Sequence, residues 1–477
     1  MAKQPDHRLV QAMQALSAGN AADASLLCEA VLSEKRGDDL ALALRAQALN
    51  ALGHYDEAMQ SITQAIAKNK KRADYHGLQA DMLTTHGHFR KAIASYDKAL
   101  KINPNHHGVI AGKANTWLRL NEPKKAHQLL KPLMNSNNAD TTILISYAKT
   151  LLSMDEPFEA AQCLIRRLPA TSEPNETRRT LYFTLGKAME QAGEYQSAFE
   201  AYAEGNTLSP SGFDVEDTKQ KYTVIKSIYP TDGIGELPTS EIDASNRVFI
   251  VGMLRSGSTL TEQIIDAHSM ARGIGESKVL PSLINAELSE KSIDAWQDLN
   301  SEQLTDIATK YLDDTQDADE YKLVVDKQLG NYQFVGMIRQ LFPNAKVIHC
   351  TRNPMSMGLS CFAQKLPPHS NPWASSLETI GQFYSTYASL MAHWSLCFND
   401  LFEVPYESLV QSQEQWTRSI LEYCGLQFDE KCLRFWESGR TVLTLSQDQV
   451  SKPMYANAVK RHEPFGSLLD PLQEQLP

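Results

Sequence analysis

The sequence predicts two parts of different class: an N-terminal solenoid made only of helices (α), then an α/β domain built on a parallel sheet. Two observations predict this division. A pattern of small residues returns every 34 residues through the first two hundred positions. Beyond it, short apolar runs rich in β-branched residues are each followed by a polar loop and a helical pattern. A chain of 477 residues is also too long for one ordinary core.

The 34-residue period is clearest in one alanine, which sits at the predicted contact between paired helices. It recurs at Ala24, Ala58, Ala92, Ala126 and Ala160, and a sixth copy, Ala198, arrives four residues late. Large residues follow four positions after most of these alanines, at Ile62, Tyr96, Leu130, Leu164 and Tyr202. Glycines that tolerate unusual φ mark the predicted turns, at Gly19, Gly53, Gly87 and Gly193. The pattern resembles the tetratricopeptide repeat, with about six copies over residues 5–212.

The function of this array stays open on the sequence. A helical solenoid presents a concave face that often takes peptides or protein partners. It can equally act as a scaffold for the adjoining domain or mediate self-association. The alanines and aromatic residues are packing residues, so none is a candidate for a functional site.

A change of composition marks the boundary between the two parts. Residues 213–246 begin with a short helical stretch and end in a segment rich in Pro, Gly, Ser and Asp, which is typical of a linker. We therefore expect a repeat array over 5–212, a linker with a short helix over 213–246, and the α/β domain over 247–477.

Composition narrows the class of protein. The formal net charge of −11 argues against nonspecific binding to nucleic acid or to an anionic membrane. The sequence contains no run of about 18 apolar residues, so we expect no membrane span. The first residues also lack the apolar core of a secretory signal. Seven scattered cysteines without a CxxC pair predict free thiols, a cytoplasmic location and no metal site.

The first strand of the α/β domain predicts an anion-binding loop. The apolar run RVFIVGM precedes LRSGSTL, and a helical pattern follows. This geometry directs backbone N–H groups and a helix N-terminus at an anion. Gly257 allows close approach, Arg255 adds positive charge, and hydroxyl donors come from Ser256, Ser258 and Thr259. The loop lacks the lysine of GxxxxGK[ST], which disfavours a nucleoside triphosphatase.

These residues resemble the 5′-phosphosulfate loop of sulfotransferases, G-x-P-R-S-G-T-T/S-L, with departures at Leu254 and Ser258. The resemblance implies a P-loop-like α/β domain that uses 3′-phosphoadenylyl sulfate as co-substrate and releases adenosine 3′,5′-bisphosphate. A second block, NAKVIHCTRNPMSMGLS, resembles the element that grips the 3′-phosphate, through Arg352 and Ser360. An arginine fork and a hydroxyl suit a phosphate dianion.

Two later segments resemble further parts of the same family. VPYESL matches the strand that brings a tyrosine, here Tyr406, close to the nucleotide. TLSQDQVSKPMYANAVKR matches a nucleotide-covering element, and it carries Ser446, Gln449, Lys452 and Arg461. The resemblance implies that Tyr406, Ser446, Lys452 and Arg461 bind the nucleotide.

The resemblance also implies the catalytic residues. In the tyrosylprotein branch a glutamate follows the D-A-H segment at the spacing of Glu276 and acts as general base. A solvent-exposed glutamate capping the next helix is the alternative. Lys327 ends the strand KLVVDK, beside Asp326, and is the candidate to stabilise the bridging oxygen, assisted by Arg255 and Ser446.

The sequence therefore predicts sulfuryl transfer to an acceptor hydroxyl. Protein tyrosine, a polysaccharide, a lipid and a small metabolite all remain candidates, and the repeats favour a peptide or protein. Two other classes stay open: a non-catalytic adaptor with a degenerate nucleotide-binding domain, and a kinase-like phosphotransferase.

Overall fold

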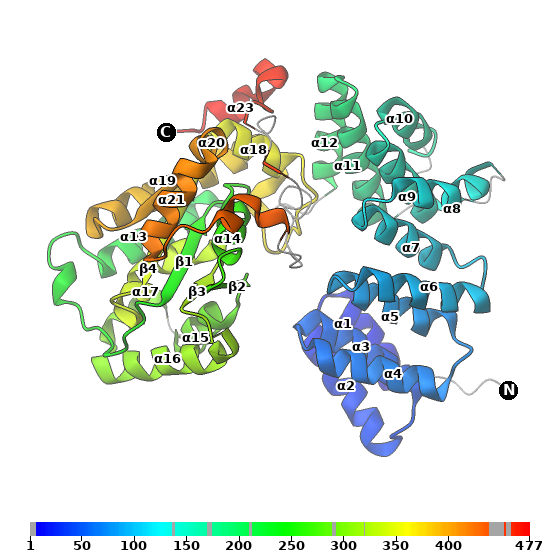
Figure 1. The fold of residues 1–477 in the computed structure, drawn as a ribbon, viewed down its shortest axis with the longest axis horizontal. Helices are drawn as coiled ribbons and strands as arrows, with labels where there is room; N and C mark the ends of the chain where they lie inside the picture. Colours follow the sequence, from blue (N-terminus) through cyan, green and yellow to red (C-terminus); the bar gives the residue numbers. More distant parts are fainter. Residues whose placement is uncertain are drawn as a thin grey trace. The chain divides into compact units, whose positions relative to one another are not determined.

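The structure is a computed structural model, shown in Figure 1. It describes residues 6–135, 139–168, 174–208, 212–288, 292–318, 320–437, 453–454 and 459–477. Contacts divide the chain into two compact units, Met1–Glu194 and Tyr195–Pro477. Each unit is described by itself.

The first unit is entirely helical in its described residues, as the repeat pattern predicts. Helices that follow one another along the chain pack together in successive pairs, as in a solenoid. They are α1 (His7–Ser17), α2 (Ala21–Glu34), α3 (Asp39–Leu52), α4 (Tyr55–Lys68), α5 (Ala73–Thr85), α6 (Phe89–Ile102), α7 (His107–Arg119), α8 (Pro123–Asn135), α9 (Thr141–Ser153), α10 (Pro157–Ile165) and α11 (Asn175–Gln191).

The periodic alanines are packing residues, as predicted. All six are completely buried: Ala24, Ala58, Ala92, Ala126, Ala160 and Ala198. The large residues four positions later are at most 1% exposed, at Ile62, Tyr96, Leu130, Leu164 and Tyr202. A methyl group at each alanine position therefore lets two helices approach closely, while the larger side chain fills the space beside it.

The turns between paired helices use left-handed backbone at a fixed place in each repeat. Gly19, Gly53 and Gly87 have φ of 81°, 91° and 77°. The next two copies lack glycine, and Asn121 and Asp155 take the same conformation with φ of 58° and 61°. Asn and Asp adopt this region more readily than other non-glycine residues, so the turn survives the loss of glycine.

The second unit contains a five-stranded, wholly parallel sheet in the order β2-β3-β1-β4-β5. The strands are β1 (Arg247–Gly252), β2 (Ala271–Gly275), β3 (Leu323–Asp326), β4 (Lys346–Thr351) and β5 (Phe402–Pro405). β1 lies in the centre, and every residue of β1 and β3 is buried. Parallel strands covered on both faces read as continuous apolar runs, which is why RVFIVG and LVV were recognisable in the sequence.

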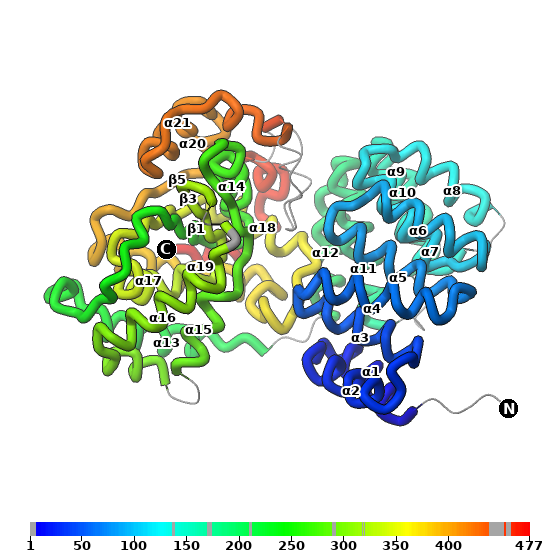
Figure 2. The backbone as a smooth tube through the Cα atoms, turned by 60° about the horizontal axis from the view of Figure 1, so that its bottom comes forward, coloured from blue at the N-terminus to red at the C-terminus, as the bar shows by residue number. Residues whose placement is uncertain are grey.

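Helices cover both faces of this sheet (Figure 2). On one face α14 (Ser258–Asp266), α21 (Gln413–Cys424) and the short helix η6 (Glu430–Glu437) share an apolar core with the strands. On the other face Phe249 of β1 packs against Tyr311 of α16 (Ser301–Asp314) and Phe342, which follows α17 (Val335–Leu341). The unit is thus a three-layer α/β/α domain.

The remaining helices of the second unit surround these layers. They are α12 (Tyr195–Thr207), α13 (Val215–Ile228), η1 (Ile234–Glu236), α15 (Val279–Leu288), η2 (Ile293–Asp298), η3 (Gln316–Ala318), η4 (Leu329–Phe334), α18 (Pro354–Phe362), η5 (Pro372–Ser375), α19 (Leu377–Cys397), α20 (Tyr406–Gln411), η8 (Glu463–Leu469) and α23 (Asp470–Gln473). None of the helices described above has both the length and the apolar character needed to cross a lipid bilayer.

Two of these helices bear on the predicted domain boundaries, which remain predictions. α12, the second helix of the sixth predicted repeat, belongs by its contacts to the second unit. α13, inside the segment predicted as a linker, packs on α19. Both α12 and α13 are thus packed on helices of the α/β domain.

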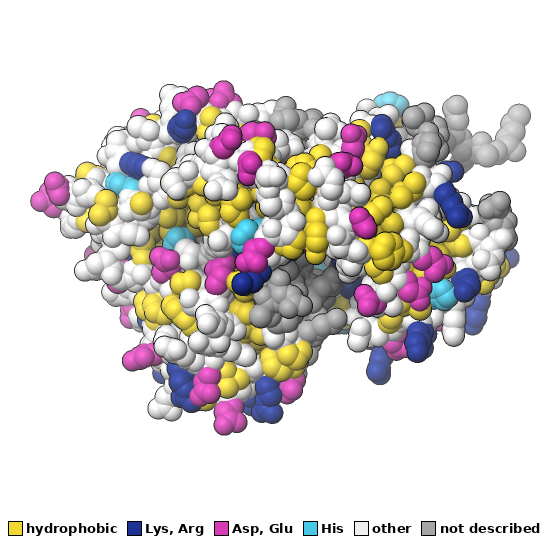
Figure 3. Space-filling view, turned by 90° about the horizontal axis from the view of Figure 1, so that it is seen from above, with side chains coloured by type: hydrophobic (Ala, Val, Ile, Leu, Met, Phe, Trp, Pro, Cys, Tyr) yellow, Lys and Arg dark blue, Asp and Glu magenta, His cyan; other side chains and the backbone are white. Residues whose placement is uncertain are grey.

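The surface carries charges of both signs. On the face shown in Figure 3, lysine and arginine side chains lie scattered among acidic ones and apolar patches. A concentration of positive charge is found instead at one edge of the sheet, inside the second unit.

Candidate active site

The candidate site lies at the carboxyl edge of the parallel sheet. Because all five strands run the same way, the residues that follow them meet at this edge. Across the sheet, in the order β2-β3-β1-β4-β5, these residues are Glu276, Lys327, the loop 253–257, Arg352 and Tyr406. Five segments that lie between residues 253 and 406 of the sequence are thereby brought together.

The loop after β1 has the backbone geometry of an anion site. Arg255 takes a left-handed conformation with φ of 68°, and Gly257 follows with φ of 95° as the N-cap of α14. Ser256 is 2% exposed, and its Oγ makes no hydrogen bond within the described part of the chain. A buried hydroxyl of this kind costs free energy unless a ligand or water completes it. Ser258 and Thr259 open α14 and are also buried.

Two features require glycine at position 257: its left-handed backbone and the close approach of Tyr406. A Cβ at this position would lie 2.6 Å from Cδ2 of Tyr406. The guanidinium of Arg352 lies over the ring of Tyr406, with its Cζ 4.6 Å from the ring centroid. The tyrosine that follows β5 therefore closes one side of the loop.

Three arginines converge on this region. Arg352 Nη1 donates to the main-chain oxygen of Arg255 at 3.0 Å, and Arg461 Nη1 donates to Ser360 Oγ at 3.4 Å. Burial lowers the pKa of both Arg255 and Arg352, and each is lowered further by the charge of Arg461. Gathering guanidinium groups that repel one another is unfavourable unless an anion joins them, so this cluster fits a phosphate-bearing ligand.

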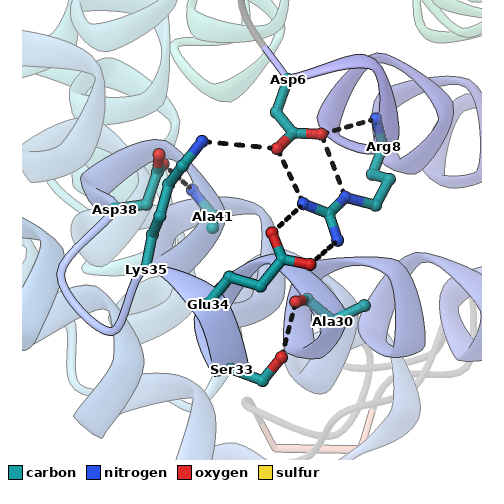
Figure 4. Close-up of polar contacts among 8 residues, drawn as sticks. All are labelled: Asp6, Arg8, Ala30, Ser33, Glu34, Lys35, Asp38 and Ala41. Atoms are coloured by element: carbon teal, nitrogen blue, oxygen red, sulfur yellow. Dashed lines mark hydrogen bonds and ion pairs between the residues drawn. The ribbon is translucent and has the colours of Figure 1, made fainter.

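An ion-pair group in the first unit shows the contrasting case (Figure 4). There Arg8 lies between two carboxylates, Asp6 at 2.9 Å and Glu34 at 2.8 Å, and Lys35 approaches Asp6 at 3.6 Å. Positive and negative charges are balanced within the group, which links the start of α1 to the end of α2. Such a group has a structural role and no evident use for an anionic ligand.

The segment before η8 lies along α18. Ser356 Oγ donates to the main-chain oxygen of Val459 at 2.8 Å and lies 2.7 Å from His462 Nδ1. Ser360, one turn later on the same helix, receives the contact from Arg461 and is 3% exposed. Arg461, from the C-terminal segment, thus contacts Ser360, one of the two residues that the sequence pattern assigns to the 3′-phosphate.

The predicted catalytic pair lies on the other side of the loop. Lys327 is completely buried, and its Nζ donates to Glu276 Oε1 at 2.7 Å. Glu276 keeps 47% of its side chain exposed. At the start of α15 a capping contact comes from Ser277, whose Oγ accepts from Val279 N at 3.3 Å. This geometry favours an interaction of Glu276 with Lys327 over the alternative of a helix cap.

The sequence reasoning missed one charged residue in this group, Glu262. It lies on α14 and is 3% exposed, and its Oε2 is 3.9 Å from Lys327 Nζ. Its Oε1 accepts from Gly275 N at 2.9 Å. The structure buries all nine residues of α14, which the sequence does not reveal, and β2, the strand that Glu262 contacts, is too rich in Gly and Arg to be recognised.

Not all predicted site residues can be located. Ser446 and Lys452, together with Gln449, lie outside the residues that the structure describes. Their roles rest on the sequence pattern alone. Asp326 is described: it is buried, it accepts from Tyr311 OH at 2.9 Å, and burial raises its pKa to about 7.

Comparison with known proteins follows the same division of the chain. Residues 247–430 match the model of the Sulfotransferase family. Residues 15–82 and 83–144 each match the model of the Tetratricopeptide repeat. The two matches coincide with the α/β domain and with most of the helical unit.

Relatives were found for both the whole chain and its second half. An uncharacterized protein of Aquifex aeolicus (strain VF5) is 25% identical over 450 residues, which cover 91% of this chain and 59% of the relative. Protein-tyrosine sulfotransferase A of Caenorhabditis elegans is 24% identical over 264 residues, covering 48% of this chain and 66% of the relative. The sulfotransferase domain of the Synechococcus PCC 7002 olefin synthase is 19% identical and covers 50% of this chain and 98% of that domain, with a TM-score of 0.37.

Proposed function

Residues 247–430 form a domain of the sulfotransferase family that follows tetratricopeptide repeats, and from this premise we propose that the protein is a sulfotransferase. Its donor is 3′-phosphoadenylyl sulfate, and its acceptor is a hydroxyl group. One observation carries the proposal: the loop after β1 lies between a guanidinium cluster, on the β4 side, and the pair Lys327–Glu276, on the β3 and β2 side.

The β4 side would hold the nucleotide. Arg352, Ser360 and Arg461 supply two guanidinium groups and a hydroxyl, which suit the 3′-phosphate. The 5′-phosphosulfate would take the backbone N–H groups at the start of α14 and the hydroxyls of Ser256, Ser258 and Thr259. The buried Oγ of Ser256, which has no hydrogen-bond partner among the described residues, supports this assignment. Tyr406, Ser446 and Lys452 are proposed as further nucleotide contacts.

The β3 side would carry the chemistry. Glu276 accepts the proton of the acceptor hydroxyl, whose oxygen forms a bond to the sulfur. The bond between sulfur and the bridging phosphate oxygen breaks, and the negative charge passes to the 5′-phosphate of adenosine 3′,5′-bisphosphate. Lys327 and Arg255, with Ser446, neutralise the charge that develops on the bridging oxygen. The exposed carboxylate of Glu276 and the buried ammonium of Lys327 suit these different roles.

The acceptor is proposed to be a peptide or protein, with tyrosine as the leading candidate side chain. Two features support this choice: the repeats, whose class commonly takes peptides, and the relatives named as protein-tyrosine sulfotransferases. This chain spans only 59% of the length of its Aquifex relative. The activity of the whole protein is therefore part of the proposal. The free cysteines fit the proposed cytoplasmic location.

The test combines binding with transfer. Adenosine 3′,5′-bisphosphate is titrated by calorimetry, and the protein is then incubated with 3′-phosphoadenylyl [³⁵S]sulfate and fractionated cell material. We expect tight binding and label in a protein fraction that releases tyrosine sulfate on digestion. Binding without any labelled product would favour the non-catalytic adaptor, and turnover with a nucleoside triphosphate alone would favour a phosphotransferase.

A further inference from the structure

The buried carboxylate of Glu262 has no role in the scheme above. It contacts Lys327 of the proposed catalytic pair and the backbone of the residue that precedes Glu276. Oε1 holds the N–H of Gly275, the residue immediately before Glu276, at 2.9 Å, and Oε2 lies 3.9 Å from Lys327 Nζ. A Cβ at Gly273 would lie 2.9 Å from Oε1, so the glycine-rich strand β2 leaves room for this carboxylate. The helix that packs on β2 thereby explains Gly273, whereas Gly275 has a left-handed φ of 71°.

Lys327 consequently lies between two carboxylates of different character. Glu276, at 2.7 Å, is half exposed, whereas Glu262, at 3.9 Å, is almost completely buried. A buried ammonium without a counter-charge is strongly unfavourable. If Glu276 takes a proton from the acceptor, it loses its charge at the moment when Lys327 must stay charged. A second carboxylate is then needed to keep the ammonium ion stable.

We propose that Glu262 is a positioning residue: it is the permanent counter-ion of Lys327 and allows Glu276 to become neutral during transfer. Its hydrogen bond to Gly275 also fixes the backbone that presents Glu276. This catalytic part of the inference rests on the proposed function, whereas the shared pairing of Lys327 does not.

The electrostatics of the cluster agree with this role. Burial raises the pKa of Glu262 to about 7, Lys327 opposes that rise, and the charge of Glu276 adds to it. When Glu276 becomes neutral, its contribution disappears, so the pKa of Glu262 falls and the ionised form of Glu262 is favoured. The charge of Glu262 in turn raises the pKa of Asp326. α21 and η6, which also pack on α14, face it with apolar side chains such as Ile420 and Phe435.

The first test measures stability and needs no activity. Melting temperatures are compared for Glu262→Gln, Glu276→Gln and the double variant. Either carboxylate alone can compensate Lys327, so the double variant should lose more than the sum of the single changes, by about 3 °C or more. Adding Lys327→Met should recover much of that loss. The matched double Glu276→Gln with Asp266→Asn should be additive, because Asp266 accepts from Gly273 N at 2.7 Å, whereas the ion pairs of Lys327 within the described residues are with Glu262 and Glu276.

The second test measures turnover against pH. Glu262→Gln preserves the acceptor for Gly275 N–H but removes the charge. We expect turnover to fall at least 10-fold with unchanged affinity for adenosine 3′,5′-bisphosphate, and the loss of activity below about pH 7 to move or disappear. Asp266→Asn should keep the wild-type pH profile. Additive stability effects, or an unchanged turnover and profile in Glu262→Gln, would overturn the inference. An inactive wild-type enzyme would refute the proposed function instead, and the stability cycle would still decide the pairing.

Discussion

Arg352 donates a hydrogen bond from Nη1 to the main-chain oxygen of Arg255, at 3.0 Å. Arg255 has a left-handed backbone, with φ of 68°, which is unusual for a residue with a Cβ. The guanidinium from β4 therefore supports the loop after β1 while its Cζ lies 4.6 Å from the ring centroid of Tyr406. One side chain links three strand ends, so its loss should affect both the 3′-phosphate contact and the shape of the loop.

Arg352→Ala should weaken binding of adenosine 3′,5′-bisphosphate by about 10- to 150-fold, because a charge-assisted hydrogen bond contributes about 1.5–3 kcal/mol. Binding of adenosine 5′-phosphate should change much less, so the preference for the 3′-phosphate is lost. Calorimetric titration with both nucleotides measures this. Arg339→Ala is the matched control, since Arg339 pairs with Asp400 at 2.7 Å. Retention of the 3′ preference in Arg352→Ala would contradict the assignment.

Gly257→Ala should reduce nucleotide affinity at least 10-fold. Alanine at φ of 95° is strained, and its Cβ would lie 2.6 Å from the ring of Tyr406. Gly330→Ala is the control, because Gly330 lies near the same edge, in η4, with open space around its Cα. Equal affinities in the two variants would show that the loop does not need glycine.

Much of the site was predictable because parallel strands end at one edge. Arg255 and Arg352 were identified separately, after two apolar runs, and the pairing of Gly252 with Cys350 brings those runs side by side. The repeat array was predictable for a similar reason, since a single period determines which residues are buried, as with Ala58 and Ala92. In both cases local patterns were sufficient to place residues that are distant in the sequence.

Glu262 and Arg461 show where sequence reasoning stops. The burial of Glu262 depends on β2, an edge strand held by β3 and by two carboxylates of α14 rather than by its own strand propensity. The family resemblance alone assigned both Arg461 and Ser360 to the nucleotide, because their contact depends on the C-terminal segment returning to α18, which no local pattern specifies. Tertiary packing decides both.

Glu276→Gln should lower turnover by about 10²–10⁴-fold, because the amide cannot accept the acceptor's proton. Affinity for adenosine 3′,5′-bisphosphate should stay within about twofold, since Glu276 lies on the β2 side of the loop. Single-turnover transfer of labelled sulfate separates chemistry from product release. Turnover close to that of the wild type would remove Glu276 from the reaction.

Acid should destabilise the protein partly through His349. This residue of β4 is buried, its Nε2 lies 2.6 Å from Tyr387 OH, and burial lowers its pKa to about 4. The unfolded state, with a histidine pKa of about 6.5, binds more protons between about pH 4 and 6.5. His349 therefore contributes stability that is present above about pH 6.5 and is lost as the pH falls toward 4, by up to about 3 kcal/mol.

The buried acids act with the opposite sign, so a difference measurement is needed. Burial raises the pKa of Glu262 and of Asp326 to about 7, and their contribution is lost as the pH rises through that value. The free energy of unfolding in urea is measured for the wild type and for His349→Gln from pH 4 to 8. Both proteins contain the buried acids, so the effect of these acids cancels in the difference. The difference in free energy of unfolding should grow with pH up to about 6.5 and then level off. A difference independent of pH would rule out titration of His349.

The last prediction concerns where the catalytic part begins. α12 is part of the second unit: Asn206 Nδ2 donates to the main-chain oxygen of Phe362 at 2.9 Å, and Phe199 stacks on the Phe362 ring with centroids 5.4 Å apart. The rings of Tyr195 and Phe465 pack edge to face, with their centroids 5.3 Å apart. Phe362 is the last residue of α18, the helix that carries Ser360. α12 therefore packs on the helix that contributes Ser360 to the proposed 3′-phosphate site.

A fragment of residues 195–477 should therefore fold and bind adenosine 3′,5′-bisphosphate like the full chain, whereas 213–477 should be less stable and bind the nucleotide more weakly. Without α12 the ring of Phe362 is uncovered and its main-chain oxygen loses a buried partner, which should lower the melting temperature by at least about 5 °C. Asn206→Ala in the full chain tests the hydrogen bond alone and should give a smaller loss in the same direction. If the two fragments have the same melting temperature and the same affinity for the nucleotide, α12 belongs functionally to the repeats. If 195–477 also sulfates the native acceptor at the full-length rate, the repeats before Tyr195 form an independent module.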